Sequence, residues 1–204
     1  MAKDQKKAHR QRAYLVLIDE SGLLMAPLVR RTWALRGQTP ILQQRGKHRE
    51  RVSVAAALWL SPDRDRMGLV YQTLVNGYFN NQRTALFLES LMRELPGRLI
   101  VIWDGGPMHK GDPIRERVEC FRPRLSLERL PPYAPMLNPV ERLWRWLKYC
   151  RLCNFAPTDA RQLNHAIVAE LDSVCKRQAE LIGFWHTSEL PLPRLVLRHQ
   201  AVAG

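Results

Sequence analysis

The chain of 204 residues is long enough for one domain with a sizeable core, and its 46% hydrophobic and 25% charged residues are the balance of an ordinary globular protein. Lysine and arginine number 32 against 19 acidic residues, and this net charge of +13 favours a polyanionic partner, first of all nucleic acid. No apolar run approaches the roughly 18 residues that a membrane span needs, and no apolar signal core follows the basic start, so we expect neither a membrane protein nor a secreted one.

The first part of the chain alternates basic segments with short apolar ones. Residues 1–12 form a basic lead that we expect to be flexible. The apolar residues 14–18 predict a buried strand, which the polar residues 19–22 should end, and residues 23–28 predict a second strand. Residues 29–51 carry seven arginines and lysines against one acid, and glycine and proline should break them into turns.

Two strands and a helix come next. Small and β-branched residues predict strands over 52–60 and 68–75, joined by a turn as members of one antiparallel set. Asn80 or Asn81 should then cap a helix whose apolar residues recur at helical spacing. Proline and glycine should end this helix near residue 95.

The second half alternates strands and helices. The near-continuous apolar residues 98–103 are typical of a strand at the buried centre of a sheet. A helix over 113–120, a strand over 125–130 and a helix over 139–152 should follow. A last long helix, capped by Thr158, should run to about Gly183 before an irregular tail.

This order of elements predicts an α/β fold with a mixed central sheet flanked by helices and a C-terminal helical extension. Right-handed crossovers would place strands 14–18 and 98–103 side by side at its centre. A site is then expected where these two strands end.

Three acidic residues stand where such a site would form. Asp19 and Asp104 follow the two central strands, and Glu141 lies in the first turn of the helix that starts at Pro139. Carboxylates from separate elements can hold two divalent ions about 4 Å apart, which activate an oxygen nucleophile and stabilise the leaving oxygen of a phosphodiester.

Each of these acids also has a structural explanation. An aspartate at a strand end commonly forms a turn. Asn138-Pro139-Val140-Glu141 fits a helix start with a cap, a proline at the first helical position and a capping-box acid. The three acids alone therefore do not decide between a metal site and local structure.

Four segments around the acids carry a more specific signal. They are Leu17-Ile18-Asp19-Glu20-Ser21-Gly22, the stretch Arg31-Thr32-Trp33-Ala34-Leu35-Arg36-Gly37-Gln38-Thr39-Pro40, Val101-Ile102-Trp103-Asp104 with His109 after it, and Leu130-Pro131-Pro132-Tyr133-Ala134-Pro135-Met136-Leu137-Asn138-Pro139-Val140-Glu141. With them the chain resembles the catalytic domain of the IS630/Tc1/mariner superfamily of DDE transposases, in particular its IS630 branch. The last segment is the most specific, and the resemblance covers residues 13–157.

The resemblance implies an RNase H-like fold in which residues 13–157 are the catalytic domain and 158–204 a C-terminal helix and tail. It implies that Asp19, Asp104 and Glu141 are the catalytic triad and the ligands of Mg²⁺ or Mn²⁺, with two ions in the site. The enzyme would be a polynucleotidyl transferase that cuts DNA hydrolytically at transposon ends, after which the freed 3′-hydroxyl attacks target DNA.

The resemblance also implies partners. DNA would be bound as transposon ends and as target, and because two ends must be brought together we expect a homodimer in the synaptic complex. The expected location is the cytoplasm of a prokaryotic cell, on the nucleoid.

The sequence departs from its relatives in two places. They carry helix-turn-helix modules before the catalytic domain, whereas only about 12 residues precede the first strand here, so we expect the catalytic half alone, with recognition lacking or supplied by a separate polypeptide. Gly105-Gly106 replaces polar residues that many relatives have after the aspartate. Two alternatives therefore stay open: a weak or inactive remnant that binds DNA non-specifically, and an RNase H-like nuclease without strand transfer.

Basic residues near these motifs are the candidate DNA contacts. They are Arg30, Arg31, Arg36, Arg45, Lys47, Arg49 and Arg51 in the arginine-rich segment, His109 after Asp104, and Arg142, Arg145 and Lys148 beside Glu141. A solvated basic surface is the alternative for the arginines and lysines, and a structural hydrogen bond is the alternative for His109.

The four cysteines are Cys120, Cys150, Cys153 and Cys175, which include a lone CxxC pair. A structural zinc site would need a second pair of ligands at comparable spacing, and the sequence offers none. We therefore expect free thiols in a reducing compartment.

Overall fold

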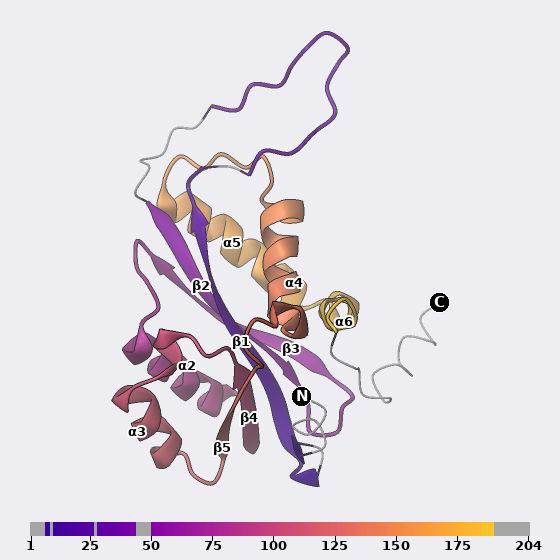
Figure 1. Cartoon of the computed structure of the whole chain (residues 1–204). Coiled ribbons are helices and arrows are strands. Elements are labelled where there is room, and N and C mark those ends of the chain that lie inside the picture. The colour runs from indigo at the N-terminus through magenta and orange to yellow at the C-terminus, as the bar shows by residue number, and fades with distance from the viewer. Residues whose placement is uncertain (1–6, 9, 27, 44–49, 190–204) are drawn as a thin grey trace.

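A computed structural model of the chain describes residues 7–8, 10–26, 28–43 and 50–189. Its centre is a mixed five-stranded sheet with the strand order β3-β2-β1-β4-β5 (Figure 1). The strands are β1 (Ala13–Leu24), β2 (Arg51–Leu60), β3 (Met67–Val75), β4 (Arg98–Trp103) and β5 (Leu125–Arg129). The predicted α/β fold with a mixed sheet is confirmed.

Strand β1 lies at the middle of the sheet. It pairs antiparallel with β2 over ten residues and parallel with β4 from Ala13, opposite Arg98, to Leu17, opposite Ile102. The predicted placement of the two apolar runs side by side is therefore confirmed. Their apolar character follows from position, because helices cover both faces of the sheet here.

The predicted end of the first strand at Asp19 is wrong, and so is a second strand over 23–28. Strand β1 continues to Leu24, because its ladder with β2 persists until Leu24 faces Arg51. The parallel ladder with β4 stops at Leu17. The polar residues that suggest a turn thus occupy a strand that has lost one of its two neighbours.

Helices cover both faces of the sheet (Figure 1). Helices α2 (Asn81–Glu94) and α3 (Asp112–Cys120) cover one face. The other face carries α4 (Pro139–Trp146), α5 (Ala160–Cys175) and α6 (Gln178–His186). The Asn80 side chain accepts a hydrogen bond from the N–H of Arg83, as expected of the cap of α2.

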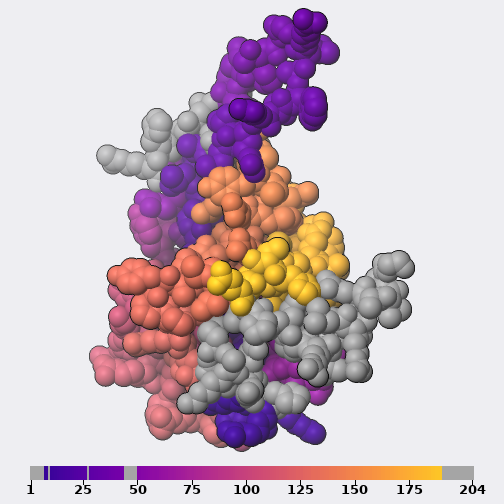
Figure 2. Space-filling view, turned by 45° about the vertical axis from the view of Figure 1, so that its right-hand side comes forward, coloured from indigo at the N-terminus to yellow at the C-terminus, as the bar shows by residue number. Residues whose placement is uncertain are grey.

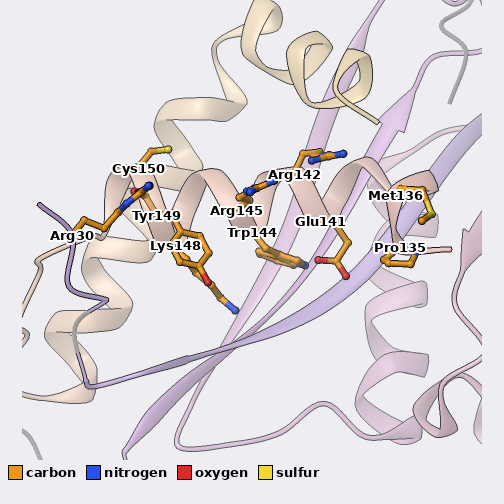
Figure 3. Close-up of a pocket in the computed structure, with 10 residues that line it drawn as sticks. All are labelled: Arg30, Pro135, Met136, Glu141, Arg142, Trp144, Arg145, Lys148, Tyr149 and Cys150. Carbon is orange, nitrogen blue, oxygen red and sulfur yellow. The ribbon is translucent and has the colours of Figure 1, made fainter. Parts of the chain in front are cut away.

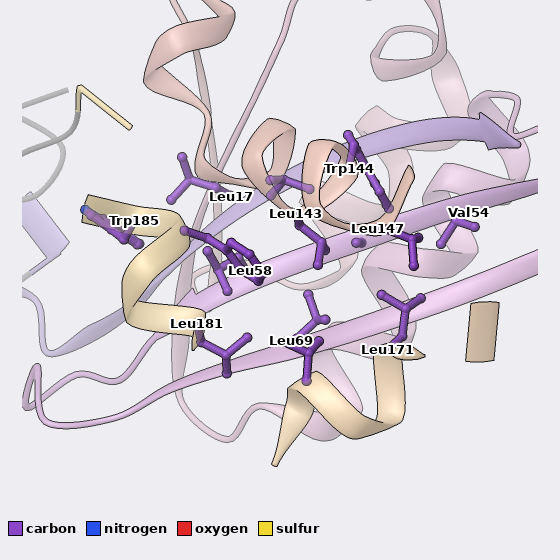
Figure 4. Close-up of a cluster of buried hydrophobic side chains, with 14 of the residues drawn as sticks. Leu17, Val54, Leu58, Leu69, Leu143, Trp144, Leu147, Leu171, Leu181 and Trp185 are labelled. Carbon is purple, nitrogen blue, oxygen red and sulfur yellow. The ribbon is translucent and has the colours of Figure 1, made fainter. Parts of the chain in front are cut away.

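Alternation along β1 divides the core in two. Leu15 and Leu17 belong to the hydrophobic cluster beneath α4, α5 and α6, part of which Figure 4 shows. Val16 and Ile18 belong to the cluster beneath α2 and α3. Helix α4 contributes Val140, Leu143, Trp144 and, just beyond its end, Leu147, all buried as the sequence predicts.

The helices after Glu141 differ from the prediction in two ways. The expected helix to residue 152 is α-helical only to Trp146 and continues as the π-helical segment η3 (Leu147–Arg151). The expected single long helix is two helices, α5 and α6, separated at Lys176 and Arg177.

The cap of α5 is Asp159 and not Thr158. The Asp159 carboxylate accepts from the N–H of Gln162 at 2.8 Å. Thr158 instead donates its own N–H to the side chain of Gln162 at 2.6 Å. Both residue types cap helices well, so the sequence could not choose between neighbours.

Residues 29–43 extend away from the sheet without regular helix or strand, and every one of them is exposed (Figures 1 and 2). We call this segment the arm. At its start, Leu28 forms an isolated bridge with Cys153, and Asn154 exchanges hydrogen bonds with the backbone of Arg30 at 2.8 and 3.0 Å. The arm is therefore anchored on the chain just after η3.

Within the described part of the chain, no helix is both long enough and apolar enough to cross a membrane.

Candidate active site

Asp19, Asp104 and Glu141 line one cavity of about 410 Å³. Asp19 comes from β1, Asp104 from the loop after β4, and Glu141 from the first turn of α4. The cavity is completed by the proline-rich loop 130–138 that leads into α4. The structure thus brings the three predicted acids together although 85 residues of the numbering separate the first from the second.

Asp19 is held in a mostly buried position. The indole N–H of Trp144 donates to its Oδ2 at 2.9 Å. Burial and, next in size, the nearby charge of Glu141 raise the pKa of Asp19 to about 7, although the Trp144 hydrogen bond partly opposes both. Without a cation in the cavity, this carboxyl therefore exchanges its proton near neutral pH, where both forms are populated.

The start of helix α4 is fixed to β1 by Asn138. The Asn138 Oδ1 accepts from the N–H of Val140 at 3.2 Å, which confirms the predicted cap. Its Nδ2 donates to the carbonyl of Ile18 at 3.1 Å, next to Asp19. Pro139 occupies the first turn of the helix, as predicted.

Glu141 does not complete a capping box in the described structure. The backbone N–H that such a glutamate would bind belongs to Asn138, and it donates to the carbonyl of Pro135 at 2.9 Å. The Glu141 side chain is exposed toward the cavity. The capping-box hydrogen bond that would explain a glutamate at this position on structural grounds is therefore not formed.

Asp104 is exposed, with 60% of its side chain accessible. Its Oδ1 accepts from the N–H of Gly106 at 2.9 Å and lies 2.6 Å from Nδ1 of His109. A Cβ at Gly106 would lie 3.0 Å from this oxygen, whereas a Cβ at Gly105 would meet nothing within 4 Å. Gly106 thus leaves the room that the carboxylate occupies.

His109 is buried behind Asp104. Its ring stacks on Trp103 with centroids 4.3 Å apart, and its Nε2 lies 3.1 Å from a carboxylate oxygen of Glu20. Burial lowers the pKa of His109, but the hydrogen bond and charge of Glu20, with a smaller contribution from Asp104, more than offset this and raise it. A direct DNA contact by His109 does not fit this position, because only 1% of its side chain is accessible.

Glu20 is the member of the site that sequence reasoning missed. It follows Asp19 in β1, so its side chain points to the opposite face of the strand, toward His109. Adjacent acids in an apolar strand were the available signal, but the partner lies 89 residues away.

A basic groove adjoins the acidic cavity (Figure 3). It has a volume of about 840 Å³ and shares Pro135 and Glu141 with the cavity. Its cationic lining is Arg30, Arg142, Arg145 and Lys148. The predicted positive stripe beside Glu141 therefore lies along a hollow surface that leads to the acids.

Among the cations of this groove, Lys148 interacts electrostatically with the acids of the cavity. Burial lowers the pKa of its ammonium group, while the charges of Glu141 and Asp19 partly offset that effect. Arg30 donates to the carbonyl of Tyr149 at 3.1 Å, which places it over the far end of the groove.

The other predicted DNA contacts are dispersed. Arg31 and Arg36 are exposed on the arm. Arg51 lies over the ring of Tyr78 at 4.1 Å, at the start of β2. Arg45, Lys47 and Arg49 lie outside the described residues.

The four cysteines are free thiols, as predicted.

The three carboxylates are ligands that a hard divalent cation prefers, but in this structure they are not gathered around one ion position. Among residues 7–8, 10–26, 28–43 and 50–189, no three carboxylate, histidine or cysteine groups are placed to hold a metal ion as they stand. The chemistry nevertheless fits, because three carboxylates share one cavity and the charge of Glu141 is one of the causes that raise the pKa of Asp19. A divalent ion would relieve that repulsion and is bound best by carboxylate oxygens.

A comparison with protein families agrees with this site. The profile of the family described as DDE superfamily endonuclease matches residues 14–164, which contain all three acids. A comparison with curated proteins finds no match.

Solved structures of a mariner transposase share the fold. A pre-cleavage Mos1 transpososome superposes with a TM-score of 0.63 at 16% identity and covers 99% of this chain and 58% of its own. The Mos1 mariner paired-end complex with Mn gives 0.61 at 18% identity, covering 98% and 56%. The catalytic domain of Mos1 alone gives 0.52 at 16% identity, covering 98% and 84%.

These likenesses confirm the RNase H-like fold expected from the sequence. The chain spans a little over half the length of the full transposases that it matches.

Proposed function

Since this chain belongs to the DDE superfamily of endonucleases, we propose that it is the catalytic domain of a transposase that cleaves DNA strands and joins them to a target, where the freed 3′-hydroxyl attacks a target phosphodiester and displaces a target 3′-hydroxyl. The observation that carries the proposal is the shared cavity of Asp19, Asp104 and Glu141 beside a basic groove. A phosphodiester strand in the groove would have its charge balanced by arginine and lysine and would meet the three acids where the groove and the cavity join.

The proposed metal ligands are Asp19, Asp104 and Glu141. Bound Mg²⁺ or Mn²⁺, two ions in all, would supply an activated oxygen nucleophile and charge stabilisation at the leaving oxygen. The Mos1 relative has been solved with Mn and with Mg, which supports this choice of ions.

The surrounding residues position the acids in this proposal. Trp144 fixes Asp19 by its indole N–H, and Asn138 joins the start of α4 to β1 so that Glu141 faces Asp19. His109 orients Asp104 and is itself held by Glu20 and Trp103. The basic side chains hold the substrate backbone.

We further propose that the chain acts within the assembly that the family resemblance implies. It comprises a homodimer that brings two transposon ends together, target DNA, and a helix-turn-helix module on the same or a separate polypeptide, on a prokaryotic nucleoid. The Mos1 relatives are paired-end and transpososome complexes, which supports DNA ends as partners. We also propose 13–157 as the catalytic domain and 158–204 as a C-terminal helix and tail; within the latter, helix α5 packs on the domain through Leu163, Ile167 and Leu171.

The test is a cleavage and joining assay with DNA that carries the ends of the encoding element, in Mg²⁺ or Mn²⁺. Wild type should yield cleaved ends and joined product, and Asp104→Asn should yield neither. Asp63→Asn, an exposed aspartate in the β2–β3 turn, is the matched control and should behave as wild type. Cleavage without joined product would replace the proposal by a nuclease, and DNA binding without cleavage in any metal would replace it by an inactive DNA-binding remnant.

A further inference from the structure

We propose that the ring of Tyr133 is a stacking platform for a base of the DNA substrate beside the reacting phosphate. This assignment rests on the proposed DNA-cleaving function and adds a substrate contact that the acids and the basic groove do not provide. Three independent features of Tyr133 carry it: its exposure, its place in the cavity and its backbone conformation.

The first feature is exposure. Tyr133 is 100% accessible, and no hydrogen bond or ring contact joins it to any described residue. The other four tyrosines all have partners: Tyr14 packs on Trp59, Tyr71 donates to Asp172, Tyr78 lies under Arg51 and Tyr149 lies under Arg30. Single exposed apolar side chains are common on protein surfaces, and Trp33 on the arm is 99% accessible as well, so exposure shows only that the Tyr133 ring is available to a partner outside the chain.

The second feature is location. Tyr133 lines the same cavity as Asp19, Asp104 and Glu141. A strand whose phosphate reaches these acids would bring the neighbouring base within the space that the ring borders. Every base offers a flat face to an aromatic ring, so stacking here would not depend on sequence.

The third feature is the backbone. Tyr133 has φ of +56°, in the left-handed region that side chains other than glycine seldom adopt. Pro131 and Pro132 precede it and Pro135 follows, and proline rings restrict the loop from both sides. A conformation that is unfavourable for a tyrosine, held by rigid neighbours at a functional cavity, is the pattern of a side chain kept in position for a substrate.

The chemistry favours the ring over the hydroxyl group. The Tyr133 hydroxyl has no acidic or basic partner among the described residues, so nothing prepares it to transfer a proton. The flat ring, by contrast, needs no further preparation to stack. Tyr133→Phe should therefore retain the function, and variants without a ring should lose it.

The experiment uses DNA ends of the encoding element in which the nucleotide next to the scissile phosphate is an unpaired 2-aminopurine, because a paired one is already quenched by its neighbours in the duplex. Fluorescence of this base falls when it stacks on an aromatic ring, and Ca²⁺ is supplied in place of Mg²⁺ for the binding measurement. Wild type and Tyr133→Phe should quench the probe. Tyr133→Ala should leave it bright and bind the end about 5- to 150-fold more weakly, the range for loss of one base stack.

Two further variants keep the test decisive. Tyr133→Gly removes both the ring and the backbone strain, so it should match Tyr133→Ala in binding while unfolding at the wild-type temperature or above. Leu86→Ala, an exposed residue of α2 with 52% accessibility, is the control and should quench as wild type does. In Mg²⁺, loss of the ring should raise KM more than it lowers kcat.

The outcomes separate this inference from the function on which it rests. If wild type cleaves its ends and Tyr133→Ala quenches and binds equally well, stacking by Tyr133 is overturned. If Tyr133→Phe fails as badly as Tyr133→Ala, the hydroxyl is the active group and the stacking role is overturned. If wild type itself cleaves no DNA, the proposed function fails, while the binding and quenching comparison still tests the ring.

Discussion

Asp19 and Asp104 line the same cavity, but the structure holds the two carboxylates in opposite ways. Asp19 lies within a strand, mostly buried, with its pKa raised to about 7 and a tryptophan N–H as its partner. Asp104 lies on a loop, 60% accessible, and is held from behind by a buried histidine. One wall of the site thus places its acid by core packing, and the other places it by a hydrogen-bonded chain.

The two acids therefore differ in what they cost the stability of the metal-free fold. On the Asp19 wall the acid itself is costly to the metal-free fold, because it is buried beside Glu141. On the Asp104 wall the exposed acid costs the fold little stability, and the buried His109 behind it provides the packing. Variants of matched chemistry on the two walls should therefore have different effects.

The largest difference is expected between Asp19→Asn and Asp104→Asn in metal-free protein at pH 8. The pKa of Asp19 rises from 3.8 in the unfolded chain to about 7 in the fold, so the native state loses stability as pH rises between these values. Asparagine removes this loss. Asp19→Asn should raise the free energy of unfolding by up to about 4 kcal/mol, and Asp104→Asn should change it by less than about 0.5 kcal/mol.

Denaturant unfolding of both variants at pH 4 and pH 8 measures this. The gain of Asp19→Asn should fall below about 1 kcal/mol at pH 4, because the carboxyl is then protonated in the native state and close to half protonated in the unfolded one. Equal gains for the two variants at pH 8 would show that burial does not distinguish the walls.

The next effect is that of His109→Ala. It removes a buried ring stacked on Trp103 and leaves Glu20 without its partner, so we expect a loss of about 3 kcal/mol in the free energy of unfolding. His165→Ala, on helix α5, is the control and should cost less than about 1 kcal/mol, because His165 is exposed. A loss no larger than that of the control would contradict the positioning role.

The titration of His109 adds a pH signature to the same wall. The pKa of His109 is raised above its ordinary 6.5, so its contribution to stability is complete below about pH 6.5 and is lost as pH rises through the native value. NMR titration of metal-free protein should find this raised pKa, and Glu20→Gln should lower it. An unchanged value in Glu20→Gln would exclude Glu20 as the cause.

A smaller effect is expected for Trp144→Phe. The change deletes the N–H that binds Asp19, so it should cost about 1–2 kcal/mol and raise the pKa of Asp19 further. Trp185→Phe is a matched control, because its equally buried indole N–H has no partner in the described structure. Thermal unfolding should show the greater loss for Trp144→Phe, and the reverse order would mean that packing outweighs the hydrogen bond.

The smallest effect on stability is expected for Gly106→Ala. Its new Cβ would press on Oδ1 of Asp104 at 3.0 Å, and because that side chain is exposed it can move at a cost of less than about 1 kcal/mol. Cleavage should nevertheless fall several-fold, since the displaced atom belongs to a proposed metal ligand. Gly105→Ala meets nothing and should retain activity, so equal rates for the two variants would argue against a fixed Asp104.

The elements that the sequence predicts well are those whose signals are local. Asn80 and Asn138 cap helices, and the apolar run before Asp104 forms a strand, because these choices depend on neighbours a few residues away. The motif around Glu141 also located the acids of the cavity.

The features that the sequence did not predict depend on distant partners. Strand β1 passes through Asp19 because β2 continues beside it, which no residue of β1 reveals. The burial of His109 follows from Glu20 and Trp103, which come from two different strands. Exposure of Tyr133 is equally invisible in a motif, since an aromatic residue between prolines would fit a packed loop as well.

Asn138 has a consequence for moving this site to another scaffold. Its carbonyl oxygen serves the helix and its amide nitrogen serves the strand edge that β4 leaves free at Ile18. Serine or aspartate would cap the helix as well, but aspartate has no proton to give the strand and serine is too short to serve both. A designer who grafts Glu141 and its helix would therefore have to transplant this asparagine too, or the acid would arrive with nothing to hold it to the sheet.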